Sequence, residues 1–208
     1  MYTLQADRLT VKNVHERLDW VRSRMDSFEK VLTLTELQSG EIQELFKIRS
    51  EFDQYLVDGQ VLEGQVRLLS VNPLLRLAGF NQAPIVIQVE QSIEPIVLSE
   101  SKITGRLDLL AIRRSELVDV PDFWVLIVEA KESGLDALQG LAQLLTYGYT
   151  SLNQQKLVWG LTTNGINYRF VHLHAGQPPQ YFLMPELNLL DSQSAIQLLQ
   201  VLKAIVIE

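Results

Sequence analysis

The sequence has no cysteine among its 208 residues, which excludes disulfide bonds and thiolate metal sites. It also has no apolar run close to the roughly 18 residues of a membrane-spanning helix. The first residues lack a basic segment followed by an apolar one, so the sequence gives no sign of a secretory signal. We therefore expect a protein without a membrane anchor. A cytoplasmic location is compatible with the absence of cysteine and is our expectation.

Positive charge is also scarce. Lys and Arg number 18 against 25 Asp and Glu, for a net charge of −7, which counts against a broad basic surface for sequence-blind binding of nucleic acid. The charge is unevenly distributed: residues 1–50 hold 8 basic and 8 acidic groups, and the other 158 residues hold 10 and 17. Because carboxylates are the usual ligands of hard cations, their excess is also compatible with a metal site.

Residues 11–32 carry apolar side chains at alternating spacings of three and four, which is a heptad pattern. The members are Val11, Val14, Leu18, Val21, Met25, Phe28 and Leu32. The pattern predicts one helix that begins after Thr10, a residue suited to capping it. Such a helix could pair with a partner or with a second copy of the chain to give a homodimer, or it could fold back on the next helix as a hairpin. Residues 1–58 are accordingly predicted to form a helical extension that could act as a dimerisation arm.

The remainder, residues 59–208, reads as one domain with an α/β (α+β) fold. A second helix is predicted in the extension, from a capping box at 35–38 through about residue 57, and the domain then opens with helices over 60–71 and 73–79, the last ended by Gly79. Three strand-like runs follow, and then a helix, a hairpin around the turn residues Asn164 and Gly165, a short strand and a final helix. These later ranges are 84–90, 105–112, 123–131, 135–152, 156–173, 181–185 and 191–208. The order predicts a mixed central sheet flanked by helices.

The strand at 123–131 contains six consecutive apolar residues and then Glu129 and Lys131. Residues two apart on a strand point to the same face, about 7 Å apart. Asp108 lies on the preceding strand, and it would lie beside Glu129 if the two strands pair. Two adjacent carboxylates raise each other's pKa unless a cation lies between them, as Mg²⁺ would. A solvated Glu-x-Lys pair at a strand end is the simpler alternative.

"GRLD" at 105–108 and "VEAK" at 128–131 resemble the two halves of the PD-(D/E)XK nuclease motif, with Leu107 in place of the proline. "EGQVRLLSVNPLLRLAGF" (63–80) is similar to the opening helix of restriction-endonuclease-like members, in particular to the amino-terminal nuclease region of type I restriction R subunits, and Glu63 is the matching acid. "QLLTYGY" and "LTTNGINYRFVHL" resemble the helix and hairpin that follow. The resemblance covers about residues 60–175, in the order of the family.

The resemblance implies a restriction-endonuclease-like fold and a metal-dependent DNA endonuclease. Asp108 and Glu129 would bind Mg²⁺ or Mn²⁺, with the Ala130 carbonyl as a third ligand, and Glu63 would join the outer shell or a second metal. Lys131 would position the attacking water. Gln143 would orient Lys131 or the scissile phosphate.

Several alternatives stay open at this level. The chain could be a nuclease-fold binding or assembly module that no longer cuts, and the absence of a G-x-x-x-x-G-K-[ST] motor motif makes a separate protein partner plausible. Arg106 could contact a phosphate, or it could pair with Glu129 or another acid. Trp20 with Arg17, Arg22 and Arg24 could contact DNA, but neighbouring acids favour an ordinary solvated face.

Overall fold

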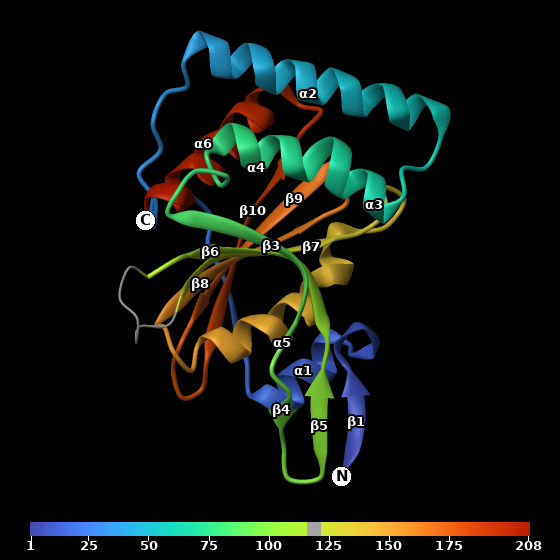
Figure 1. Cartoon of the computed structure of the whole chain (residues 1–208), viewed down its shortest axis with the longest axis vertical. Coiled ribbons are helices and arrows are strands. Elements are labelled where there is room, and N and C mark those ends of the chain that lie inside the picture. The colour runs from blue at the N-terminus through green and yellow to red at the C-terminus, as the bar shows by residue number, and fades with distance from the viewer. Residues whose placement is uncertain (116–121) are drawn as a thin grey trace.

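The computed structural model describes residues 1–115 and 122–208. A seven-stranded mixed sheet runs through its middle in the order β2-β10-β9-β8-β7-β6-β3 (Figure 1). The pairs β7–β8 and β10–β2 are parallel, and the others are antiparallel. The strand bounds are β2 Val21–Arg24, β3 Ile85–Ser92, β6 Arg106–Arg113, β7 Phe123–Ala130, β8 Leu157–Thr163, β9 Asn167–His174 and β10 Gln180–Asn188.

Helices cover both faces of this sheet. On one face lie α2 (Ser39–Asp58), α4 (Asn72–Ala78) and α6 (Ser192–Ile207), and on the other lie α1 (Val11–Leu18) and α5 (Leu141–Ser151) (Figure 1). The shorter helical segments are η1 Ala6–Arg8, α3 Glu63–Val66, η2 Arg67–Val71 and η3 Ala137–Gly140. A second sheet of three strands, in the order β1-β5-β4, lies beyond α1; its strands are β1 Tyr2–Gln5, β4 Ile96–Val97 and β5 Ser101–Thr104.

The sheet separates two hydrophobic cores. The first core, under α2, α4 and α6, includes Phe52, Leu75, Trp159 and Leu199. The second core, against α1 and α5, includes Val14, Leu144, Tyr147 and Tyr181. Since both faces of the central strands are covered, these strands need apolar residues at consecutive positions. The apolar run of β7 meets this need: Leu126 and Val128 enter the first core and Ile127 enters the second. The predicted mixed sheet flanked by helices is confirmed.

The predicted helix over 11–32 is wrong. Thr10 does cap a helix, through a bond from the Asn13 N–H to its hydroxyl, but α1 ends at Leu18 and Asp19 takes a left-handed conformation (φ 55°). The chain then forms β2, which pairs in parallel with β10 at the edge of the sheet. The heptad positions fall into different cores: Val14 and Leu18 lie in the second, and Phe28 and Leu32 in the first. One apolar stripe of a straight helix could not reach both faces of a sheet.

The all-helical character expected of residues 1–58 is therefore wrong as well, because this stretch contributes β1 and β2. With the heptad helix gone, the expected homodimer through it loses its basis. The next helix starts later than predicted, at Ser39, with Gln38 and Glu41 forming its capping box. The predicted helices over 60–71 and 73–79 are one continuous helical run from α3 through η2 to α4, which ends at Gly79 in a left-handed conformation as expected. Among the described residues, no helix is both long and apolar enough to cross a membrane.

The hairpin turn at Asn164–Gly165 provides a test of this packing. Gly165 has a positive φ of 87°, and a Cβ added there would lie 2.4 Å from the Phe52 ring in the first core. We expect Gly165→Ala to lower the free energy of unfolding by about 2 kcal/mol, through backbone strain and overpacking. Gly40→Ala is the control, because no atom lies within 4 Å of its added Cβ. Urea denaturation followed by circular dichroism measures both, and equal midpoints would contradict the packing described.

Candidate active site

The two acids of the predicted motif face each other across β6 and β7. The antiparallel register that pairs Leu109 with Val128 brings Asp108 opposite Glu129. The Ala130 N–H donates to Asp108 Oδ2 at 2.8 Å, and the Asp108 N–H donates to Glu129 Oε1 at 3.3 Å. The condition on which the sequence argument depended, that the two strands pair, is met.

Glu129 is the most unusual of these groups because it is fully buried and incompletely satisfied. Its side chain has no exposed surface, and its Oε2 has no hydrogen-bond partner among the described residues. Burial raises the pKa of Glu129 well above its ordinary value, and the neighbouring Asp108 raises it further, while Lys131 lowers it. A carboxylate in this position is unfavourable unless positive charge is supplied nearby.

Lys131 supplies part of that charge. It follows the last residue of β7, and its backbone N–H donates to the Thr163 carbonyl at 2.7 Å, which holds the chain in line beyond the strand. Its Nζ donates to Gln143 Oε1 of α5 at 2.8 Å and lies 4.0 Å from Glu129 Oε2. Of the two roles expected for Gln143, the contact with Lys131 is the one that the structure contains.

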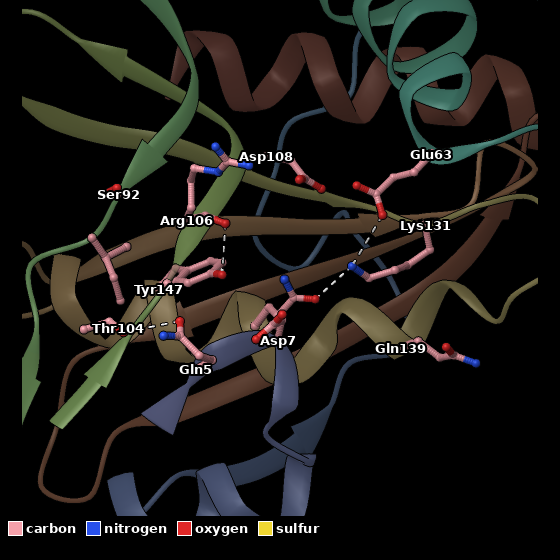
Figure 2. A pocket seen from close by; sticks show the side chains of 13 residues that line it. Gln5, Asp7, Glu63, Ser92, Thr104, Arg106, Asp108, Lys131, Gln139 and Tyr147 are labelled. Atoms are coloured by element: carbon pink, nitrogen blue, oxygen red, sulfur yellow. Dashed lines mark hydrogen bonds and ion pairs between the residues drawn. The ribbon is translucent and has the colours of Figure 1, made fainter. Parts of the chain in front are cut away.

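Glu63 reaches the same place from the first turn of α3. Its Oε2 lies 4.0 Å from Lys131 Nζ, and the two side chains point toward each other (Figure 2). Partial burial raises the pKa of Glu63, Asp108 raises it further, and the cations Lys131 and Arg67 oppose the rise. The five predicted catalytic residues, Asp108, Glu129, Lys131, Glu63 and Gln143, are thus brought together.

Sequence reasoning missed Arg67 and Glu90. Arg67, one turn after Glu63, lies 3.6 Å from Asp108 Oδ1 and 3.8 Å from Glu90 Oε1. Glu90 also lies 3.3 Å from Arg106, which settles the partner of Arg106 as another acid rather than Glu129. The i, i+4 spacing of Glu63 and Arg67 on a predicted helix was a usable signal. Glu90 gave none, because a lone acid at the end of a strand-like run is commonly a solvated residue.

Four of the five predicted catalytic residues, Glu63, Asp108, Lys131 and Gln143, line a cavity of about 800 Å³, and Glu129 is buried behind it. Its other wall comes from residues before α1: Gln5 at the end of β1 and Asp7 in η1 (Figure 2). Tyr147 closes one side, and its hydroxyl donates to the Arg106 carbonyl at 3.1 Å. Burial raises the pKa of Tyr147, so the hydroxyl stays protonated as a donor. No element was predicted for residues 1–10, so the contribution of Gln5 and Asp7 was also missed.

The carboxylates of the site can be matched to the ligands that a divalent cation needs. Across 1–115 and 122–208, no three His, Cys, Asp or Glu side chains are grouped to hold a metal by themselves. Mg²⁺, however, needs only one or two carboxylates and keeps several waters. The Asp108–Glu129 pair meets that need, and Glu129 Oε2 is a buried oxygen that accepts no hydrogen bond from the described residues. The residues fit a hard divalent cation that takes few protein ligands.

Comparison with known proteins adds little. No protein-family model matches the chain, and no curated protein matches it. Among solved structures, it is similar to a chain described as the fragment structure of an HsdR subunit of a type I restriction enzyme from Vibrio vulnificus YJ016, at 18% identity and a TM-score of 0.41. That alignment covers 67% of this chain but 25% of the other. At this TM-score the similarity carries no argument about function, which is therefore argued from the site.

The pKa of Glu129 predicts an effect of pH on stability. Its pKa is raised on folding, so its contribution to stability is complete below the ordinary carboxyl pKa and is lost as pH rises toward the folded value. Glu129→Gln removes this ionisation. Without divalent cations, we expect the variant to unfold at higher urea than the wild type at pH 7, with the difference disappearing near about pH 4. The exposed Glu16→Gln is the control, and a Glu129→Gln variant less stable than wild type at pH 7 would contradict the assignment.

Proposed function

We propose that this protein is a metal-dependent nuclease that hydrolyses phosphodiester bonds of DNA. The observation that carries the proposal is the buried Asp108–Glu129 pair, with Lys131 held beside it by Gln143 in an open cavity. A buried acid with a raised pKa such as Glu129, next to a positioned lysine, is costly to a fold, and such groups are concentrated at functional sites. The sequence resemblance to PD-(D/E)XK nucleases adds independent support.

Asp108 and Glu129, with the Ala130 carbonyl, would hold Mg²⁺ or Mn²⁺, and Glu63 would lie in the outer shell. The bound cation would supply positive charge that stabilises the phosphoryl oxygens and makes water more acidic. The protein's own part is to present two carboxylates on adjacent strands, where the Ala130 N–H holds Asp108 Oδ2 and the Asp108 N–H holds Glu129 Oε1.

Lys131 would orient the attacking water and offset charge on the phosphate. One of its three N–H groups is taken by Gln143, which leaves two for a water and a phosphate oxygen. The water oxygen bonds to phosphorus, one phosphorus–oxygen ester bond breaks, and the leaving alcohol takes a proton. Glu63, whose pKa is raised and which lies near Lys131, suits the role of accepting the proton released by the water.

An idle nuclease-fold module that acts with a partner protein is the second candidate. One observation favours it: Arg67 already lies against Asp108, Glu90 and Glu63, so part of the carboxylate charge is neutralised without a metal. A module of this kind would not need a divalent cation. Metal binding therefore separates the two candidates.

Cleavage tests the role of Lys131. In Mg²⁺ or Mn²⁺, we expect the wild type to nick or linearise supercoiled plasmid, and Lys131→Ala to lower the rate by about 100-fold or more, because one preorganised donor is lost. Lys47→Ala, on the exposed surface of α2, is the control and should cut like the wild type. Equal cleavage by the Lys131→Ala and wild-type proteins would remove Lys131 from the mechanism.

Mn²⁺ binding, measured by isothermal titration calorimetry, tests the carboxylate pair without any activity. We expect Asp108→Asn to weaken Mn²⁺ binding by about tenfold or more, because one of two charged ligands is neutralised. Asp53→Asn changes the charge equally on an exposed face of α2 and should leave binding unchanged. Absence of Mn²⁺ binding by the wild type would favour the idle module over the nuclease.

A further inference from the structure

A second hollow with positive charge lies beside the candidate active site. Its volume is about 520 Å³, and it lies between β2, β9, β10 and η3. We call it the basic groove. Its charged members are Arg22, Arg24, Lys30, Arg169 and Asp26.

The basic groove opens on the same face of the sheet as the candidate site. On β2, Arg22 and Arg24 are opposite Tyr181 and Leu183 of β10, which belong to the second core. Side chains opposite each other on paired strands share a face. Glu129 of β7 is paired in register with Thr162 of β8, and Thr162 is paired with Arg169 of β9. These three residues form a row across the sheet. Glu129 and the groove therefore lie on the same face of the sheet.

One short turn separates the two hollows. The segment η3 contacts β7, β8 and β9. Its residue Gly140 lies over the row, since an added Cβ there would be 3.1 Å from Glu129 Cβ and 3.2 Å from Thr162 Cγ2. Gln139 lines the cavity of the candidate site, and its neighbour Leu138 lines the basic groove. An extended ligand can pass from one to the other across η3.

Two of the cations in the groove are free of acidic partners. Lys30 pairs with Asp26 at 2.5 Å, and Arg169 pairs with Glu186 at 2.8 Å. Arg22 and Arg24 are exposed and form no ion pair within the described ranges. In a chain of net charge −7, two unpaired guanidinium groups on the face of the site are a localised attraction for phosphate. The sequence alone favoured a solvated face for them, because acids lie near them in a segment that was expected to be a helix.

The distance between the candidate site and the basic groove corresponds to a short length of duplex DNA. From β7 to β2 the sheet has four strand spacings, or about 19 Å. The axial rise of B-DNA is about 3.4 Å per base pair, so this is the length of roughly five or six base pairs.

We propose that the basic groove binds the phosphate backbone of duplex DNA, about five or six base pairs away from the phosphate in the candidate site. The inference rests on the proposed function for the choice of ligand. Arg22 and Arg24 act as binding residues that hold the flanking backbone, while the cavity at Asp108 and Glu129 receives the bond to be cut.

The test is DNA binding without cleavage. Binding of a fluorescein-labelled 24-base-pair duplex is followed by anisotropy in EDTA at several salt concentrations. Each phosphate contact contributes about 0.9 to the slope of log K against log salt. We expect the Arg22→Gln/Arg24→Gln double variant to reduce that slope by about two and to weaken binding by about tenfold or more at low salt.

Lys12→Gln/Lys47→Gln is the matched control, because it removes the same charge from exposed positions outside the groove. It should keep the slope of the wild type, and unchanged thermal unfolding of both double variants verifies their folding. A slope and affinity of the groove variant equal to those of the wild type would overturn the inference, as would no DNA binding by the wild type. Groove-dependent binding with no cleavage in Mn²⁺ would support the groove and contradict the nuclease proposal, so the two failures are distinguishable.

Discussion

The buried carboxylate of Glu129 is the constraint around which the site is built. The central strand β7 is covered on both faces, and a charged group at its end must be neutralised, protonated or coordinated. Burial and Asp108 both raise the pKa of Glu129, and Lys131 at 4.0 Å offsets only part of this effect. A purely structural role would be served better by an apolar residue, because replacing buried charges by well-packed hydrophobic groups is often neutral or stabilising. The arrangement is what we would expect of a site that gives up stability to bind a ligand.

Ion pairs also fix the charged residues that surround the Asp108–Glu129 pair. Glu90 has a left-handed backbone (φ 53°) in a strand, a conformation that costs a non-glycine residue about 1 kcal/mol or more. Its carboxylate lies near both Arg67 and Arg106, and these ion pairs help to keep it there. Arg67 in turn lies against Asp108. Arginines therefore neutralise part of the negative charge of the site, and a divalent cation would have to compete with the Arg67 guanidinium for Asp108.

The sequence supported accurate prediction where local pattern and tertiary environment agree. The apolar run of β7 and the Asn164–Gly165 turn each follow from one local rule, and each is found. The heptad pattern of residues 11–32 failed because spacing does not reveal which core a side chain enters. Val14 and Phe28 lie on opposite sides of the sheet, joined by a strand at its edge.

The residues of the candidate site also divide into those that the sequence could predict and those that it could not. The five motif residues could be predicted because the strand order and the resemblance fix where they meet. Glu90, Gln5 and Asp7 could not, since β3 and the amino-terminal segment bring them to the site only through long-range packing, Glu90 through its ion pairs and Gln5 and Asp7 as lining of the cavity.

The amino-terminal segment, expected to be an arm apart from the domain, belongs to its functional face. Gln5 and Asp7 line the cavity of the candidate site, and Arg22 and Arg24 line the basic groove. The same short segment thus places acidic and polar groups at one end of the face and unpaired positive charge at the other. A polyanion approaching this face is attracted to the groove and repelled by the carboxylates until a cation neutralises them. On the proposed function, binding and reaction would then depend on different charges, and a protein of net charge −7 would bind DNA through a local surface.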